Sequence, residues 1–352
     1  MEQLIDRFGE DFSMLIVGLL VGSIFGFAAY NSKFCLRAAT IELSKGIFGT
    51  RLAIWLVAFL SALLSVQAAI ALQVLDVSQS RQLAATGSLS GAIIGGLLFG
   101  CGMVLARGCA SRLLVLSASG NLRAIVTGLV LTLTAQASLR GVFAPAREAL
   151  AGIWTIEGGP ARQLFADSAT MQTLILIFGF VALVCVLHFA YSRGAPLIEL
   201  SFATLVGVAV FAGWQLTYLI AQSSFEIVEV QSVTFTGPST DTLMGLVNER
   251  TIPARFGLGL VPGVFLGAFS AALIKGEARI QRFGPDVPME RYLVGGILMG
   301  FGSMLAGGCA VGAGMTGGSV LSVTAWIAAF FMWVGAMTTY WIIQARPSLG
   351  HA

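Results

Sequence analysis

Two stretches of the chain, 200 residues apart, have nearly the same sequence. GGLLFGCGMVLARGCA at 95–110 and GGILMGFGSMLAGGCA at 295–310 are identical at ten of sixteen positions without a gap. A match at one fixed offset is typical of a chain built from two related units. Any fold for this sequence must therefore accommodate two equivalent segments, each rich in glycine and each ending in a cysteine.

Both copies belong to apolar stretches that are long enough to cross a bilayer. Hydrophobic residues make up 57% of the 352 residues and charged residues 11%, whereas soluble domains carry about 25% charged residues. A transmembrane helix needs about 17–25 apolar residues. The sequence therefore predicts an all-α membrane protein with about nine transmembrane helices. The predicted spans lie near 12–31, 52–75, 89–107, 121–143, 171–191, 197–221, 256–274, 291–306 and 320–344.

The positions of the two copies predict an inverted repeat. The first copy falls in the third span and the second in the eighth, so an odd number of spans separates them and they run in opposite directions. We expect a first repeat over 1–150 (spans one to four), an external loop and connector span over 151–195, and a second repeat over 196–352 (spans six to nine). This architecture is typical of secondary transporters, whose substrate site lies near the membrane midplane between the repeats.

A glycine-rich segment follows each copy, near 108–120 and 307–319. Both are too short and too rich in glycine to span the bilayer as regular helices. Irregular backbone at membrane depth persists where it is buried in protein or lines a cavity. We therefore predict two re-entrant segments.

Basic residues predict the orientation, because short cytoplasmic loops are enriched in Lys and Arg. The loop after the first span is basic, the loop 222–253 is acidic, with Glu226 and Glu249, and the loop 275–291 is basic. These signs place the N-terminus in the periplasm and the C-terminus in the cytoplasm. The acidic N-terminus does not look like a signal peptide, so we expect the first helix to be retained. The charged residues of the first loop are Lys33, Arg37, Glu42, Lys45 and Arg51.

The charge pattern also narrows the classes of function. The net charge is +3 and no basic tract or phosphate-binding loop occurs, which argues against nucleic-acid binding and ATP use. His188 and Glu199 are the only His or acidic residues inside the predicted spans, and both lie near one end. A proton relay needs ionisable groups deep in the membrane. We predict a transporter with no metal, no cofactor and no catalytic residues.

Cys109 and Cys309 occupy the same place in the two copies and are candidate substrate-binding residues. A buried thiol stays neutral, and a neutral thiol is a weak donor that does not repel an anion. Neighbouring glycines, Gly108 and Gly308, let backbone N–H groups approach a ligand. Such a site suits a soft, sulfur-bearing anion better than a hard cation.

Other residues have both a functional and a structural interpretation. Arg107 is explained by the positive-inside tendency or by attraction of an anion, and Gly307 replaces it in the second copy. Thr236 lies in SVTFTGP, 232–238, which reads as an extended external segment that ends in a Gly-Pro turn. Its hydroxyls either contact an anion or belong to a structural turn. We interpret Cys101 and Cys185 as packing residues.

Four motifs along the chain occur together in one order: NSKFCLRAA (31–39), ARGCAS (106–111), GWQLT (213–217) with SVTFTGP (232–238), and GGILMGFGSMLAGGCAVGAGMTG (295–317). Through them the chain resembles the YeeE/YedE family of bacterial inner-membrane sulfur transporters over essentially its whole length. The resemblance implies thiosulfate uptake into the cytoplasm through a path lined by three cysteines, here Cys35, Cys109 and Cys309. Family members often work beside a soluble sulfur carrier of the TusA type, which we expect here to be a separate polypeptide on the cytoplasmic side.

Two alternatives remain open from the sequence. One is transport of a different cargo, such as a selenium compound, sulfide, sulfite or a soft metal ion. The other is a membrane thiol oxidoreductase that cycles Cys109 and Cys309 through a disulfide, although the lack of a CxxC motif argues against it.

Overall fold

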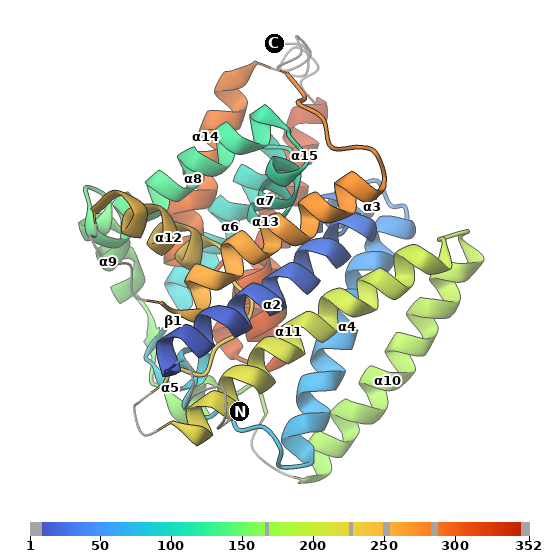
Figure 1. The fold of residues 1–352 in the computed structure, drawn as a ribbon, viewed down its shortest axis with the longest axis vertical. Coiled ribbons are helices and arrows are strands. Elements are labelled where there is room, and N and C mark those ends of the chain that lie inside the picture. The colour runs from blue at the N-terminus through green and yellow to red at the C-terminus, as the bar shows by residue number, and fades with distance from the viewer. Residues whose placement is uncertain (1–8, 166–168, 225–227, 249–253, 283–287, 346–352) are drawn as a thin grey trace.

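The computed structural model describes residues 9–165, 169–224, 228–248, 254–282 and 288–345. Within them the chain is almost entirely helical, with one short antiparallel pair of strands, β1 and β2 (Figure 1). Glu226 and Glu249, which contributed to the predicted orientation, lie outside the described residues. The elements are α2 Glu10–Asn31, α3 Leu36–Ser44, α4 Thr50–Ala71, α5 Arg81–Ala84, β1 Gly87–Ser88, α6 Leu89–Leu105, α7 Ala110–Ala118, α8 Leu122–Arg140, α9 Ala144–Gly152, β2 Thr155–Ile156, η1 Gly159–Arg162, α10 Ala169–Ser192, α11 Leu197–Ser223, α12 Thr236–Asn248, α13 Phe256–Ile274, α14 Met289–Leu305, η2 Ala310–Gly317 and α15 Val323–Ala345.

The described residues contain nine segments that are long and apolar enough to cross a membrane. This confirms the predicted number, and the observed bounds of α11 and α13 match the predicted ones within two residues. Hydropathy locates these helices because a membrane span needs a continuous stretch of apolar side chains to contact the lipid. Its backbone polar groups are hydrogen-bonded within the helix. The glycine-rich segments 108–120 and 307–319 fold as the short helices α7 and η2.

Close helix pairs make up the interior. Helix α2 packs along α13, and α6 packs against both α14 and α15. Glycines form these contacts: a Cβ at Gly18 or Gly22 would collide with the backbone of α13. Small residues allow such approach where no hydrophobic effect drives helices together. Helix α10 lies at the outer edge beside α4, and most of its surface is exposed (Figure 1).

The contacts of the duplicated helices are reciprocal. Gly95 on α6 lies against Gly302 on α14, and Gly102 on α6 lies against Gly295 on α14. Helix α6 packs on α15, and α14 correspondingly packs on α8. Each of these two glycine contacts between α6 and α14 thus becomes the other when both of its residues are replaced by those 200 positions away.

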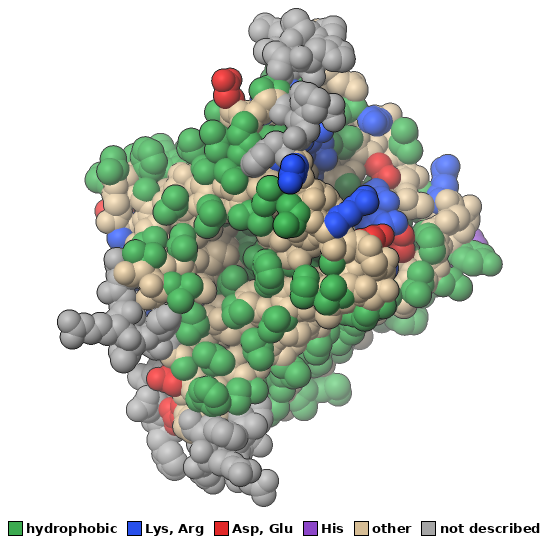
Figure 2. Space-filling model, turned by 45° about the horizontal axis from the view of Figure 1, so that its top comes forward, with side chains coloured by type: hydrophobic (Ala, Val, Ile, Leu, Met, Phe, Trp, Pro, Cys, Tyr) green, Lys and Arg blue, Asp and Glu red, His purple; other side chains and the backbone are tan. Residues whose placement is uncertain are grey.

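The surface has a basic end and an apolar periphery. Figure 2 brings forward the end of the molecule that is uppermost in Figure 1 and shows Lys and Arg side chains gathered there, on an otherwise largely apolar surface. At the opposite end Arg162 is buried and donates hydrogen bonds to Ala85 O (2.7 Å) and Thr324 Oγ1 (2.6 Å). Burial lowers the pKa of this guanidinium.

Candidate functional site

The three candidate cysteines occupy one recurring position in the fold. Each is the N-terminal cap of a short helix that follows the end of a longer apolar helix. Cys35 precedes α3, Cys109 precedes α7 and Cys309 precedes η2. Each thiol therefore lies where a helix presents unpaired backbone N–H groups and the positive end of its dipole.

The chain reverses into each of these helices through the same backbone turn. The residue two positions before each cysteine adopts a positive φ: 54° at Lys33, 55° at Arg107 and 78° at Gly307. A left-handed residue after a helix is the mark of the Schellman motif, in which the next N–H bonds to a carbonyl five residues back. The corresponding bonds are Phe34 N to Ala29 O (3.2 Å), Gly108 N to Met103 O (3.1 Å) and Gly308 N to Ser303 O (2.9 Å).

Sequence reasoning from the repeat related Cys109 to Cys309 and reached Cys35 only through the family resemblance. The structure shows that Cys35 has the same turn. The available signal was weak, because a non-glycine residue, Lys33, occupies the left-handed position, where glycine is the usual indicator.

Cys35 and Cys109 are brought together. The two thiols lie near each other, and the Cys35 thiol also lies near the guanidinium groups of Arg112 and Arg37. Cys109 is fully buried, and its Sγ lies 3.3 Å from Ser111 Oγ. The first-repeat turn and the first-span turn thus meet at a pair of sulfur atoms beside a guanidinium.

Cys309 has different surroundings. It is fully buried, and its Sγ accepts a hydrogen bond from Gly312 N at 3.4 Å. The side chain of Thr234 lies directly against Gly312, and Thr316 Oγ1 donates to Val233 O. The wall of this second turn therefore includes Val233 and Thr234.

The structure corrects one predicted feature of SVTFTGP. Residues 232–234 belong to no helix or strand, and the expected Gly-Pro turn is wrong, because Gly237 and Pro238 lie in the first turn of α12. Proline is well tolerated in the first turn of a helix, where its missing N–H has no intrahelical partner. Thr236, the first residue of α12, is buried.

The remaining candidates separate into buried and exposed residues. Gly108 and Gly308 are buried beside their cysteines, and a Cβ at Gly308 would crowd the backbone of Ala313. Arg107 is exposed. The two other cysteines lie elsewhere: Cys101 Sγ is 3.6 Å from Gly335 O, as expected for a packing residue, whereas Cys185 is exposed on α10.

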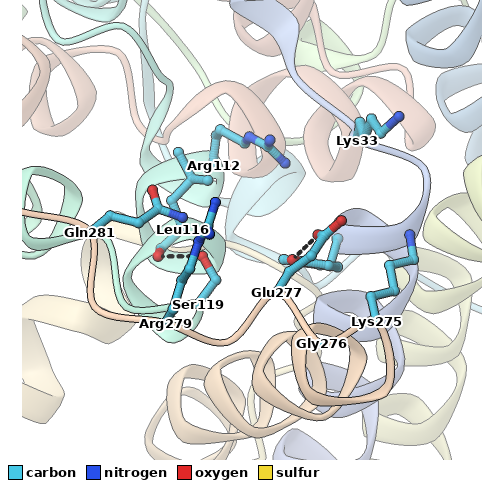
Figure 3. Close-up of a pocket in the computed structure, with 10 residues that line it drawn as sticks. Lys33, Arg112, Leu116, Ser119, Lys275, Gly276, Glu277, Arg279 and Gln281 are labelled. Atoms are coloured by element: carbon cyan, nitrogen blue, oxygen red, sulfur yellow. Dashed lines mark hydrogen bonds between the residues drawn. The ribbon is translucent and has the colours of Figure 1, made fainter.

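A basic cavity of about 500 Å³ opens next to the Cys35 turn. Figure 3 shows that Lys33, Arg112, Lys275 and Arg279 surround it, together with the single carboxylate of Glu277. Tyr30 donates a hydrogen bond to Glu277 Oε2. The remaining lining residues are Leu116, Ser119, Gly276 and Gln281.

This arrangement suits anions. Three helix N-termini carry cysteine thiols, and a cluster of cations lies beside two of them. Within the described residues no group of three or more His, Cys, Asp or Glu side chains could hold a metal ion, and all five cysteines are free thiols. The sulfur contacts join Cys109 to Cys35 and Ser111, and Cys309 to Gly312.

Comparisons with known proteins agree with this chemistry. The chain matches a family model described as sulphur transport over residues 31–338. It is 26% identical to the thiosulfate transporter TsuA of Escherichia coli K12, over 96% of both chains. It is 27% identical to the thiosulfate transporter TsuA of Spirochaeta thermophila, over 95% of this chain and 100% of the relative. The predicted family, and a transporter in place of an enzyme, are thereby confirmed: the chain belongs to the sulphur transport family of membrane proteins.

Proposed function

We propose that this protein carries thiosulfate, or a closely related sulfur-containing anion, across the bacterial inner membrane into the cytoplasm. The observation that carries the proposal is the set of three cysteines at the N-termini of α3, α7 and η2, after three equivalent turns. The two relatives named as thiosulfate transporters support the cargo.

The chemistry of the thiols explains how an anion could move past them. Neutral Cys109 and Cys309 donate weak hydrogen bonds to a sulfur-bearing anion, and the helix N-termini supply positive potential without a bound charge. Weak binding at several successive sites lets an ion enter and also leave. The buried glycines Gly108 and Gly308 keep the backbone close to the path, and Arg107 and Thr236 support it.

The reciprocal contacts of α6 and α14 support an inverted repeat, with α7 and η2 as its two re-entrant segments. In this arrangement the basic end of the molecule faces the cytoplasm. The anion then meets Cys309 first, Cys109 next and Cys35 last. A separate sulfur carrier of the TusA type would collect the cargo at the basic end.

Uptake of ³⁵S-labelled thiosulfate into proteoliposomes tests the proposal. We expect wild-type protein to transport the label, and we expect Cys109→Ala and Cys309→Ala each to lose most of the activity. Cys35→Ala should also lower uptake, whereas Cys101→Ala and Cys185→Ala, which change thiols away from the three turns, serve as matched controls. Wild-type uptake that all three site variants retain would overturn the thiol path. Inactive, well-folded wild type would overturn the cargo.

A further inference from the structure

The basic cavity contains an excess of positive charge. Lys33, Arg112, Lys275 and Arg279 line it against one carboxylate, Glu277, which already accepts a hydrogen bond from Tyr30. Within the described residues, the ion pairing of these four cations consists of one contact, from Lys33 Nζ to Glu199 Oε1 at 2.9 Å. Glu199 lies outside the cavity lining and also pairs with Arg51, at 3.6 Å. With Lys33 paired to Glu199, the lining leaves Arg112, Lys275 and Arg279 against Glu277, an excess of two positive charges that would neutralise one divalent anion.

Backbone pairing holds one wall of the cavity in place. Arg279 N donates to Ser119 O (3.3 Å) and Gln281 N donates to Gly120 O (2.9 Å). Gly120 adopts a φ of 93°, and a Cβ there would collide with Arg279 O. The loop that carries Arg279 is therefore fastened to the turn between α7 and α8.

Two of the cations that line the cavity, Arg112 and Lys33, lie within three residues of the paired cysteines. Arg112 lies on α7, three residues after Cys109, which caps the N-terminus of that helix. Its guanidinium lies near the Cys35 thiol and lines the cavity together with Tyr30. Lys33 lies two residues before Cys35, in the turn itself. Figure 3 shows Arg112 reaching from α7 toward the middle of the cavity.

We propose that this cavity is a binding station for a divalent sulfur oxyanion, which receives the ion from the Cys35–Cys109 pair through Arg112. The station rests on the proposed transport function and adds a site at which charge, and not sulfur contact, holds the cargo. The thiols recognise the sulfur end of the anion, whereas the cations bind its oxygens. Sulfate, which has the oxygens but no terminal sulfur, should therefore bind here.

Isothermal titration calorimetry in detergent at an ionic strength of about 0.15 M, where the Debye length is about 8 Å, tests the station independently of transport. The reference protein is the triple variant Cys35→Ala/Cys109→Ala/Cys309→Ala, which keeps the cavity and removes the thiols. We expect it to bind sulfate and thiosulfate with similar affinity. Adding Lys275→Gln and Arg279→Gln should weaken both by about tenfold or more, because hydrogen bonds between charged groups are lost.

Arg282→Gln, added to the same triple variant, is the matched control. It removes one positive charge three residues after Arg279, outside the cavity lining, and should leave affinity within about twofold, because exposed charges at that distance are screened. Monodisperse elution and an unchanged Tm establish that each variant is folded. A folded triple variant that binds no sulfate, or equal weakening by Arg282→Gln, would overturn the station while leaving uptake by wild type untouched. Sulfate binding that the cavity variants abolish would uphold the station even if wild type failed to transport thiosulfate.

Discussion

The turns at Cys109 and Cys309 have the same backbone but different side chains. Both end a helix with a Schellman motif and place a buried cysteine at the cap of a short helix. After the cysteine they diverge: α7 is a regular α-helix with Arg112 on it, whereas η2 is a π-helix with Gly312 at the matching place. The duplication preserved a way to present a thiol and left the surrounding charge free to differ.

This difference gives the two turns different charge and packing. Arg112 contributes a cation between Cys35 and the basic cavity, whereas Gly312 is closely packed against Thr234. A π-helix widens the turn and often marks a functional site. An anion at Cys309 would meet backbone N–H groups, and an anion at Cys109 would meet a guanidinium as well.

The largest expected effect comes from filling the space at Gly312. A Cβ there would collide with the side chain of Thr234, so Gly312→Ala should destabilise the fold by about 1–3 kcal/mol. We expect a Tm in detergent several degrees lower and a clear loss of uptake. Gly314→Ala is the control, since nothing lies within 4 Å of a Cβ at that position in the same helix. Equal Tm values for the two variants would contradict the close packing of the second turn.

The next effect comes from removing the cation of the first turn. Arg112→Gln should lower the initial rate of thiosulfate uptake about tenfold, which corresponds to a loss of ~1.4 kcal/mol of favourable interaction. Arg112→Lys should retain part of the rate, because the charge remains although the planar fork is lost. Normal uptake by Arg112→Gln would show that the two turns differ without functional consequence.

A smaller effect is expected at Ser111, whose hydroxyl lies 3.3 Å from Cys109 Sγ and is replaced by Val311 in the second copy. Ser111→Ala removes this contact and should lower uptake about fivefold, for a hydrogen bond of ~1 kcal/mol. Ser117→Ala is the matched control, because that hydroxyl bonds to Leu113 O on the same helix. If both variants transport equally well, the thiol does not need its hydroxyl partner.

The smallest effects concern the left-handed residues. Gly307 has a φ of 78°, so Gly307→Ala should lower stability by about 1 kcal/mol. Arg107→Gly relieves the same backbone strain in the first turn but raises the conformational entropy of the unfolded chain. These two contributions to the free energy of unfolding have opposite signs, so we expect little net change in stability. Thermal unfolding of the two variants beside wild type would measure this asymmetry. A larger loss at Arg107 than at Gly307 would mean that the arginine side chain itself stabilises the turn.

The sequence predicted the long transmembrane helices but missed two of the short helices. The predicted spans 256–274 and 89–107 correspond to Phe256–Ile274 and Leu89–Leu105, since a bilayer imposes a length of apolar sequence. Helices α9 and α12 were missed because they are short and weakly apolar. Pro145 and Pro238, near their first residues, were the available start signals.

The sequence predicted the cysteines of the candidate site but not the residues around them. Cys109 and Cys309 were found through a local repeat without gaps, and Cys35 through a family resemblance. Their surroundings were not predictable, because the partners come from distant parts of the chain. Lys275 and Arg279 looked like residues of a basic loop, and the sequence held no sign that they share a cavity with Lys33 and Arg112.

The sequence by itself determined a membrane protein of about nine spans with a duplicated glycine–cysteine segment. Hydrophobic length and local identity are properties of contiguous residues, so no folding calculation is needed to read them. Only the tertiary structure decided that Cys35 meets Cys109 and that four cations from three segments surround one cavity. Those neighbours are set by how α2, α7 and α13 pack on one another, and packing is decided by close backbone contacts between segments far apart in the chain.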